Sequence, residues 1–534
     1  MQHSESVARL SHPPFDFWNL RGWVCVATVL LLNQYASADP PQRVQPVTVG
    51  SFEIARLEES LQSVAQENAK LAEEVRNLKA QVESSTVAST QFENDNAFAN
   101  NEFQPNLPTY DPSLSEDAAR WSAHGLVDSP TGSSGSHKMV NYFATYDRGI
   151  TLGPHRFDES PFSLKVNFQN TFRYTGFSKD ADFWVDSTGV SNPIQDSSQF
   201  GIPRGRLILS GNAFKEDISY LLSIDYNTVN NNPIGFRAYA LSYRVSRALQ
   251  LHVGQNKVPG TREWLNSSFD TQQGPDRSMA TTFFRPSLSQ GIWLTGEPCD
   301  GLNYHAMVSN GFNTLNLNTS QLNNRYCISE SVWWEPWGDF GRGYSDLENH
   351  SSPVIRLGNS WTYSLETGSQ SSNYPENSSI RLSDGTLITQ EGALAPNVTL
   401  ESFNLSLLAL DAALKYRGWG LSTEIYRQGL NSLSGNGPLQ VSSLTSYGGV
   451  AQIGTFVIPQ KVELYSRNSY VTGAYGSGTE IGAGLNCFPI RGRTSLRFTF
   501  DVAWLDSSPA DQNRTGFVAG QSGYLFRTQL ASSF

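Results

Sequence analysis

The stretch LRFTFDVAW, residues 496–504, alternates apolar and polar side chains at every second position. Phe498 and Phe500 fall on one face, whereas Thr499 and Asp501 fall on the other. Successive side chains of a β-strand point to opposite faces, so this pattern predicts a strand with one apolar and one polar face. A tilted strand needs about 9–11 residues to cross a membrane, more than the usual five or six of a sandwich strand. The run therefore favours a membrane-spanning strand.

The same alternation recurs in residues 164–174, 220–226 and 239–245. Residues 524–534 repeat it up to a terminal aromatic residue, Phe534, a pattern typical of the closing strand of an outer-membrane barrel. Unpaired backbone groups are not tolerated in lipid, so strands of this kind must close into a ring. The sequence predicts an all-β transmembrane barrel.

The number of strands follows from length. Residues 136–534 would supply 16 or 18 strands with roughly 25 or 22 residues per strand and connection, which suits short turns on one side and long loops on the other. Barrels of this size enclose an aqueous channel. We therefore expect a 16-stranded porin barrel, with 18 strands as the alternative.

The N-terminus has the features of a secretory signal peptide, predicted over residues 1–38. A polar stretch is followed by the apolar run 22–32 and by the small residues Ala36-Ser37-Ala38. A single membrane anchor is the alternative, but an apolar run of this length is too short, since a spanning helix needs about 20 residues.

Residues 51–83 carry apolar side chains at alternating spacings of three and four, which predicts a short α-helical coiled coil. Asn68 occupies one seam position, where a polar side chain fixes the register. A single amphipathic helix is the alternative, and the seam does not decide between two and three strands. Residues 84–135 are rich in Ser, Asn, Asp and Pro and are predicted to be a polar linker.

Composition excludes several classes of function. The chain of 534 residues has a formal net charge of -11, whereas binding nucleic acid requires a basic surface. No apolar run is long enough for an α-helical membrane bundle. After removal of Cys25 with the signal peptide, three cysteines remain, so at most one disulfide could form, for example between Cys299 and Cys327.

Several segments resemble the phosphate-selective porin (porin O and P) family, and the likeness covers most of residues 140–534. They are residues 161–167 with 172–174, residues 200–226 including Arg204 and Arg206, residues 254–259 with 262–264, residues 276–278 with 284–286, and residues 462–467 with 479–481. The resemblance implies trimers of 16-stranded barrels that pass anions along Arg and Lys side chains, and relatives carry N-terminal coiled coils.

Basic side chains on the polar strand faces are the predicted lumen cations: Lys165, Arg173, Arg206, Arg237, Arg244 and Arg497. Residues 256–290 are long enough to fold into the barrel as a constriction loop, with the cations Lys257, Arg262, Arg277 and Arg285. Alternatively, these cations pair with neighbouring acids and hold the loop against the wall. Residues 1–135 have 17 acidic and 8 basic residues, leaving 32 acidic and 30 basic residues, a net charge of -2, for residues 136–534. This near-neutral barrel argues against strong phosphate selectivity.

We expect an outer-membrane porin for passive diffusion of small anions, with phosphate or polyphosphate as candidate solutes, and with the N-terminal segment in the periplasm. The alternative is a general porin for small polar solutes whose coiled coil is anchored to the cell wall. Expected partners are outer-membrane lipid, the outer-membrane assembly machinery and two further copies of the chain. The sequence has no motif for a catalytic site, a metal or a cofactor, so we predict neither enzymatic activity nor a cofactor. A carboxylate pair formed by Glu424 and Glu463 could imitate a glycosidase site, but lumen charges are the better interpretation.

Overall fold

The computed structural model describes residue 73 and residues 142–146, 148–154, 162–230, 234–315, 317–375 and 379–534. Two units are distinguished, Met1–Thr131 and Gly132–Phe534, and all described strands belong to the second. The predicted signal peptide, the polar linker and the coiled coil with Asn68 lie outside the described residues, apart from Glu73, which is helical. These three assignments remain predictions.

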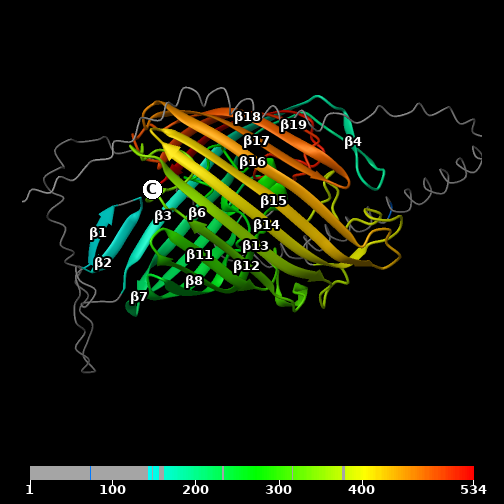
Figure 1. The fold of residues 1–534 in the computed structure, drawn as a ribbon, viewed down its shortest axis with the longest axis horizontal. Helices are drawn as coiled ribbons and strands as arrows, with labels where there is room; N and C mark the ends of the chain where they lie inside the picture. The colour runs from blue at the N-terminus through cyan, green and yellow to red at the C-terminus, as the bar shows by residue number, and fades with distance from the viewer. Residues whose placement is uncertain are drawn as a thin grey trace, which may run out of the picture. The chain divides into compact units, whose positions relative to one another are not determined.

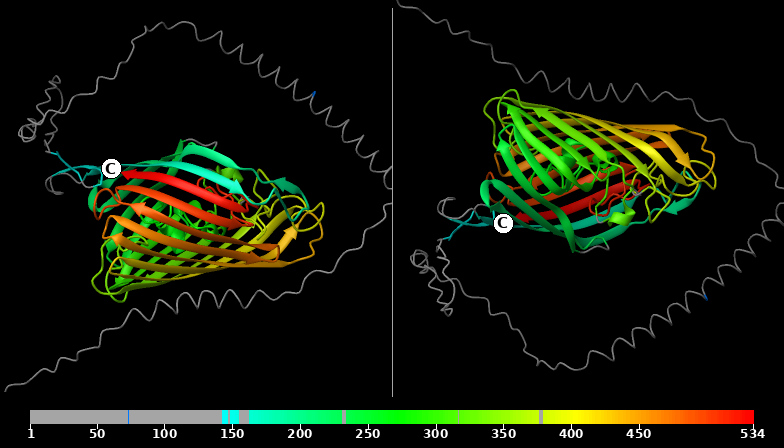
Figure 2. Two further views of the ribbon diagram at one scale, coloured as in Figure 1. Left: turned by 90° about the horizontal axis from the view of Figure 1, so that it is seen from above. Right: turned by 90° about the horizontal axis from the view of Figure 1, so that it is seen from below.

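Sixteen strands form a closed antiparallel barrel, because each pairs with the next along the chain and β20 pairs with β3 (Figures 1 and 2). The strands are β3 (Leu164–Lys179), β6 (Ser197–Ala213), β7 (Lys215–Tyr226), β8 (Ile234–Ser246), β9 (Leu249–Lys257), β10 (Leu288–Cys299), β11 (Leu302–Ser309), β12 (Cys327–Trp334), β13 (Val354–Thr367), β14 (Leu400–Tyr416), β15 (Trp419–Gly435), β16 (Ser443–Ile458), β17 (Val462–Gly473), β18 (Gly476–Cys487), β19 (Leu496–Asp506) and β20 (Gly523–Ser533). The prediction of a 16-stranded barrel is confirmed.

Two further strands extend the sheet without entering the ring. β1 (Tyr142–Tyr146) pairs with β2 (Ile150–Pro154), and β2 pairs with the first residues of β3. β20 pairs with β3 only from Gln169 onwards, so β2 occupies the edge of β3 that β20 leaves open. The sheet thus has 18 strands, but the 18-stranded barrel considered from the sequence is wrong. A separate small sheet is formed by β4 (Phe183–Val185) and β5 (Ser191–Pro193).

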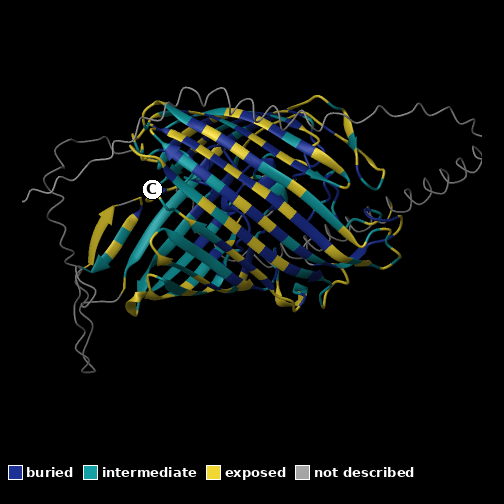
Figure 3. Ribbon diagram, in the orientation of Figure 1, coloured by how far each residue is buried: buried dark blue, intermediate teal, exposed yellow. Residues whose placement is uncertain are grey.

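The barrel wall has an apolar outside and a polar inside, as the alternation predicts. Phe498 and Phe500 are 41% and 46% exposed, whereas Thr499 and Asp501 are 0% and 1% exposed. Figure 3 shows the same alternation of buried and exposed residues along neighbouring strands. In the part of the chain that the structure describes, no helix has the length and apolar content of a membrane span.

The chain closes the barrel with its last residue. Phe534 donates its backbone N–H to the carbonyl of Phe168 and accepts the N–H of Phe168, at 2.9 and 2.6 Å. The two rings also pack together, with centroids 5.4 Å apart. Phe534 therefore lies at the seam between β20 and β3, the position expected for the end of a closing strand.

The two ends of the barrel differ in the length of their connections. One end carries tight turns such as residues 247–248, 300–301 and 417–418, and one long connection, residues 335–353. The other end carries most of the long connections, including residues 258–287, 368–399 and 507–522. In outer-membrane barrels the short turns face the periplasm and the long loops face outwards. We call the two ends the short-turn end and the long-loop end.

The main apolar core lies inside the barrel at the long-loop end. Leu405 and Leu407, which point inwards from β14, belong to one buried cluster with Phe284, Ile388 and Phe517. The last three residues come from the three long connections 258–287, 368–399 and 507–522. These connections therefore fold into the lumen and are held there by burial of apolar surface.

The three described cysteines are free. Cys327 is buried in the wall and Cys299 is exposed at a short turn. The disulfide between Cys299 and Cys327 that the sequence left open is not formed.

Candidate constriction of the channel

The connection between β9 and β10, residues 258–287, crosses the lumen. The carbonyl of Pro259 accepts a hydrogen bond from Thr362 of β13 at 2.6 Å, whereas the carboxylate of Asp276 accepts one from Arg173 of β3 at 3.1 Å. β13 and β3 lie on opposite sides of the ring. The segment expected to form a constriction loop is therefore inside the barrel, and we call residues 258–287 the constriction loop.

Two short helices shape this loop, α3 (Arg262–Leu265) and α4 (Met279–Phe284). The side chains of Thr261 and Ser278 cap them by accepting hydrogen bonds from Trp264 and Thr281, at 3.1 and 3.2 Å. An N-cap hydroxyl of this kind satisfies a backbone N–H that the helix leaves unpaired. Each helix ends at a residue in extended conformation, which returns the chain to the wall.

Carboxylates of the barrel wall accept hydrogen bonds from backbone N–H groups at the start of each helix. Glu424 of β15 accepts the backbone N–H groups of Arg262 and Glu263, the latter at 3.1 Å, and Glu480 of β18 accepts that of Met279 at 2.7 Å. Negative groups are stabilised at such unpaired N–H groups. Glu424 thus anchors the loop to the wall, as does Glu463, which accepts a hydrogen bond from Gln273 at 2.9 Å.

Close packing of the loop on the wall also depends on a glycine. A Cβ atom on Gly454 of β16 would lie 2.1 Å from the Gln273 amide nitrogen and 2.6 Å from a carboxylate oxygen of Glu463. Any larger residue would force the side chain of Gln273 away from Glu463. The wall is therefore built to receive the loop.

Three of the four predicted loop cations surround a single indole ring. Lys257, Arg277 and Arg285 lie over the ring of Trp264 at 5.2, 4.8 and 4.4 Å from its centroid. Lys257 also donates to the carbonyl groups of Trp264, Leu265 and Asn266, at 2.9, 3.0 and 2.8 Å. The electron-rich face of a Trp ring attracts cations, so Trp264 brings together charges that would otherwise repel each other.

The fourth loop cation, Arg262, has other partners. Its guanidinium lies over the rings of Phe340 and Tyr344, at 5.2 and 4.7 Å, and donates to the hydroxyl of Ser422 at 3.0 Å. A carboxylate oxygen of Asp411 lies 3.8 Å away. Arg262 and Arg277 are only 3% and 2% exposed, so these cations contact protein groups more than open water.

Two of the loop cations, Arg277 and Arg285, are buried near other arginines. Burial lowers the pKa of Arg277 to about 10, and Arg204 contributes to the shift. Burial lowers the pKa of Arg285 to about 9, and neighbouring Arg277 contributes. Arg285 also has an Nε–H group without an acceptor among the described residues. Because arginine stays protonated in proteins, such shifts signal cations that the protein compensates only in part.

The strongest concentration of charge is an arginine cluster on the wall formed by β3, β6 and β8 and on the connection 507–522. Asp276 pairs with Arg173, at 3.1 Å, and with Arg204. Asp225 pairs with Arg206, at 2.9 Å, with Arg237, at 3.8 Å, and with Arg514. We define the arginine cluster as Arg173, Arg204, Arg206, Arg237 and Arg514. Five cations share two carboxylates, so the cluster with its acids has a net charge of +3.

The remaining predicted lumen cations are spread along the wall. Arg497 is buried and donates to the carbonyl groups of Gln272, and of Phe269 at 3.3 Å, so it supports the constriction loop. Lys165 is half-buried near the short-turn end of β3, beside Thr151 of β2. Arg244 lies near the short-turn end of β8 and pairs with Asp217 at 3.1 Å. The structure therefore brings Arg173, Arg206 and Arg237 together, and leaves the other three apart.

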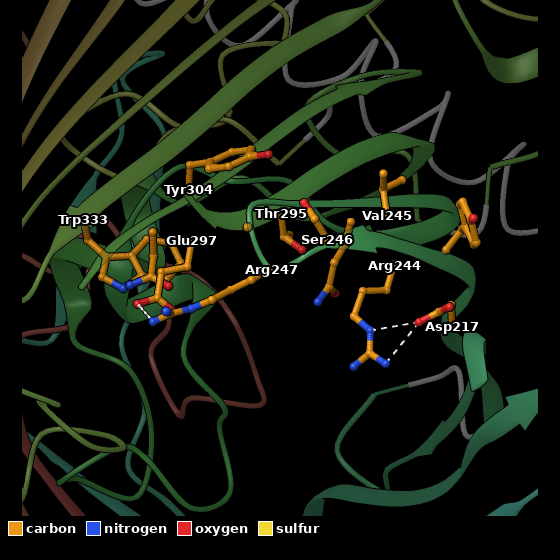
Figure 4. Close-up of a pocket in the computed structure, with 13 residues that line it drawn as sticks. Asp217, Arg244, Val245, Ser246, Arg247, Thr295, Glu297, Tyr304 and Trp333 are labelled. Atoms are coloured by element: carbon orange, nitrogen blue, oxygen red, sulfur yellow. Dashed lines mark hydrogen bonds and ion pairs between the residues drawn. The ribbon is translucent and has the colours of Figure 1, made fainter. Parts of the chain in front are cut away.

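A vestibule of about 810 Å³ opens at the short-turn end between β7 and β12 (Figure 4). Figure 4 shows Arg244 directed towards Asp217 and Arg247 directed towards Glu297. The side chains of Arg244 and Arg247 are 52% and 66% exposed. Trp333, Thr295 and Gln250 also line the vestibule. Arg247 also pairs with Asp300, at 2.9 Å, so both arginines of the vestibule are matched by acids, unlike those of the arginine cluster.

One group among the described residues has metal-ligating chemistry, Asp346, Glu348 and His350. Asp346 accepts the backbone N–H of Gly418 at 2.7 Å and contacts His350, and Glu348 lies 3.4 Å from the ammonium of Lys415. These groups have partners within the protein. We assign no metal site to them.

Sequence reasoning missed two members of the arginine cluster. Arg204 lies two residues before Arg206 on the same strand, so its place on the polar face could have been predicted from the alternation. Arg514 lies in the irregular connection 507–522, where no periodicity indicates direction. Arg467 was also missed; its guanidinium donates to the carbonyl of Asp276 at 2.8 Å.

Comparison with known proteins agrees with the predicted resemblance. Residues 175–329 match the model of the phosphate-selective porin O and P family. No curated protein matches the chain. The match covers β6–β11, the constriction loop and three arginines of the cluster, Arg204, Arg206 and Arg237.

Several porins are among the solved structures that the comparison matches to this chain. An anion-selective porin from Comamonas acidovorans is 12% identical, with a TM-score of 0.44 over 70% of this chain and 99% of that chain. OmpT of Vibrio cholerae in its trimer form is 11% identical, with a TM-score of 0.43 over 70% and 99%. OmpF of Salmonella typhi is 12% identical, with a TM-score of 0.43 over 73% and 100%. The closed barrel and the family match support an outer-membrane porin channel.

Proposed function

We propose that the protein is a porin for the passive diffusion of small anions, with phosphate and polyphosphate as candidate solutes. The observation that carries this proposal is the arginine cluster, in which five guanidinium groups share Asp225 and Asp276. The cluster borders the constriction loop, since Asp276 belongs to that loop. An excess of cations at the narrow part of a channel attracts anions and repels cations.

The chemistry of arginine favours phosphate-like solutes within this class. A planar guanidinium can donate two parallel hydrogen bonds to a phosphate or carboxylate. Arg237 and Arg514 keep 11% and 19% of their side-chain surface exposed, so they are the members best placed to meet a solute. We propose that the more deeply buried Arg173, Arg204 and Arg206 add to the positive electrostatic potential at Arg237 and Arg514. Arg262, Arg277 and Arg285 of the constriction loop, and Lys257 at the end of β9, would add to this potential while holding the loop in shape.

Ion selectivity tests the proposal directly. The reversal potential of the purified channel in planar bilayers under a salt gradient should have the sign for anion preference. The double variant Arg237→Gln with Arg514→Gln should shift it towards cations and weaken block of chloride current by phosphate. The matched control is Arg325→Gln, which removes an exposed charge from the connection between β11 and β12. A near-zero reversal potential in the unmodified channel, without block by phosphate, would reject anion selectivity.

A general porin for small polar solutes is the second candidate. It is favoured by the vestibule, where Arg244 and Arg247 are matched by Asp217 and by Glu297. Paired charges surrounded by water discriminate weakly between ions. This candidate predicts weak selectivity and little response to the double variant, and it leaves the porin fold unaffected.

We further propose that the barrel assembles in outer-membrane lipid as a homotrimer, with help from the outer-membrane assembly machinery acting on the closing strand that ends at Phe534. The N-terminal segment would lie in the periplasm, where the coiled coil with Asn68 at its seam could hold the trimer together or anchor it to the cell wall. Cross-linking of intact cells should give a trimer. Loss of the trimer on deletion of residues 51–83 would assign assembly to the coiled coil, and its persistence would leave only the anchor role.

A further inference from the structure

Residues 335–353 depart from the pattern of the short-turn end. Neighbouring hairpins there need only residues 300–301 or 417–418 to turn, whereas β12 and β13 are separated by a long segment. The strands themselves could be joined tightly, since Trp334 and Leu357 still pair in the ladder. The extra residues are therefore not required for closing the barrel. We call residues 335–353 the inserted segment.

The inserted segment folds into the lumen instead of remaining in the solvent. Phe340 and Tyr344 are 2% and 3% exposed. A short loop in solvent could not bury two aromatic side chains by itself, so other parts of the barrel must cover them. Ser345 donates to Glu463 of β17 at 2.8 Å, and Lys415 of β14 donates to the carbonyl of Arg342 at 3.0 Å. The segment is thus attached to the inner side of the wall at two separate strands.

The inserted segment meets the constriction loop in the lumen. The backbone N–H of Tyr344 donates to the carbonyl of Thr271 at 3.1 Å, and the rings of Phe340 and Tyr344 cover the guanidinium of Arg262. Gly343, whose φ is +71°, permits this approach, because a Cβ there would lie 2.7 Å from the same carbonyl. The constriction loop enters from the long-loop end and the inserted segment from the short-turn end.

A cavity lies where the two segments meet. Its volume is about 230 Å³, and it is lined by Asp270 and Thr271 of the loop, by residues 342–345 of the inserted segment, and by Arg497 of the wall. The side chain of Arg342 is 73% exposed and approaches Asp270 to 3.8 Å. A solute that enters this cavity therefore contacts both the constriction loop and the inserted segment.

We propose that residues 335–353 form a second constriction, which enters the channel from the short-turn end and limits its conductance. Phe340 and Tyr344 act as positioning residues, because they fix the guanidinium of Arg262 and so the first helix of the constriction loop. This inference rests on the channel function but not on its selectivity for anions. The conductance therefore tests this inference, and the reversal potential tests anion selectivity, so that either proposal can be refuted without the other.

Shortening the inserted segment tests the proposal in the full chain. Residues 337–351 are replaced by Asn-Gly, a dipeptide that forms tight turns between antiparallel strands. Single-channel conductance should rise roughly two-fold or more, since a pore-narrowing element is removed, while the sign of the reversal potential is unchanged. Heat modifiability on gels confirms that the variant barrel is folded. A folded variant with unchanged conductance would overturn the proposal.

A second variant covers the case in which the shortened chain does not fold. Arg342→Cys, in a Cys299→Ser background, is treated with a bulky thiol reagent during recording. Modification should reduce the current, because the side chain at this position lines the cavity. The matched control is Lys215→Cys, also an exposed cation at the short-turn end but at the start of β7, away from this cavity. A current that is insensitive at position 342, or reduced equally at position 215, would overturn the proposal.

Discussion

Neutralising Asp276 should both weaken the fold and strengthen the preference for anions. Asp276 is fully buried, pairs with Arg173 and Arg204, and accepts the backbone N–H of Arg277 at 2.8 Å. The variant Asp276→Asn keeps the shape of the side chain but removes its charge. The two guanidinium groups then face each other without the shared carboxylate, and the net charge of the cluster and its acids rises from +3 to +4.

The expected loss in the free energy of unfolding is large because Asp276 and both of its arginine partners are buried. Arg173 and Arg204 are 2% and 3% exposed, so solvent cannot replace the lost carboxylate. Removal of one partner from a buried ion pair typically costs about 3–5 kcal/mol, because it leaves an uncompensated buried charge. The matched control is Asp300→Asn, since Asp300 pairs with Arg247 in an exposed position and such pairs contribute little.

The sign of the pH dependence also follows. Burial alone would raise the pKa of Asp276, but Arg204 and Arg173 outweigh burial and lower it below its usual range. A carboxylate with a lowered pKa in the folded state stabilises the protein above its pKa in the unfolded state, and the stabilisation is lost as pH falls through the lower folded value. The unmodified barrel should therefore keep this contribution at pH 5, and Asp276→Asn should remove it at all pH values above the unfolded pKa.

Urea unfolding of the barrel in lipid vesicles, followed by tryptophan fluorescence, measures the change in the free energy of unfolding. Combining Asp276→Asn with Arg204→Gln should recover part of the loss, because the second change removes one of the unpaired cations. A loss no larger than that of Asp300→Asn would refute the assignment of Asp276 as the shared counter-ion. An unchanged reversal potential in a stably folded variant would show that the cluster does not face the ion pathway.

Three further predictions concern the wall, the loop and the N-terminal segment. Phe500→Arg should cost about 2–4 kcal/mol in the free energy of unfolding if the residue lies near the bilayer midplane; Thr499→Arg, on the inner face, should also destabilise, because Thr499 is buried and donates to Asn486 at 2.7 Å. Trp264→Leu should increase current fluctuations in single-channel recordings, because Lys257, Arg277 and Arg285 lose a common aromatic partner; steady current would contradict this role. A peptide of residues 51–83 should associate in sedimentation equilibrium, and Asn68→Leu should stabilise it while broadening its oligomer distribution; a monomeric, unfolded peptide would exclude the coiled coil.

The barrel wall was predictable because its physics is local. The direction of Phe500 and Asp501 depends only on their positions in an alternating strand, and the structure places them outside and inside as expected. The same alternation places Arg173 and Arg206 on the inner face, and both lie in the arginine cluster. Arg237 also lies in the cluster, but its position has the parity of the exposed Tyr243 and Val245. An irregularity in the pairing of β7 with β8 skips Arg237 and reverses the alternation there. Local periodicity therefore sorts residues between the two faces of the wall only where the ladder is regular.

The partners of the lumen charges were not predictable, because they come from irregular connections. Arg262 lies under aromatic rings more than 70 residues away in the chain, and Arg514 reaches Asp225 from the connection between β19 and β20. Nothing in the composition of residues 335–353 indicates that Phe340 and Tyr344 turn into the lumen. Long connections have no regular alternation of apolar and polar residues. The constriction loop could be predicted from the length of its segment, but the position of the inserted segment in the lumen could not.

The distribution of charge, and not its sum, bears on the proposed selectivity. The barrel part of the chain has a net charge of -2, which by itself argues against an anion channel. However, several of its acids lie at the surface, such as Asp300 and Asp182, whose side chains are 92% and 79% exposed. Salt screens such charges over about 8–10 Å, whereas partly buried charges in a narrow passage are screened much less. A net charge of +3 beside the constriction loop can therefore set the sign of the potential that an ion meets in the channel, although the chain as a whole is acidic.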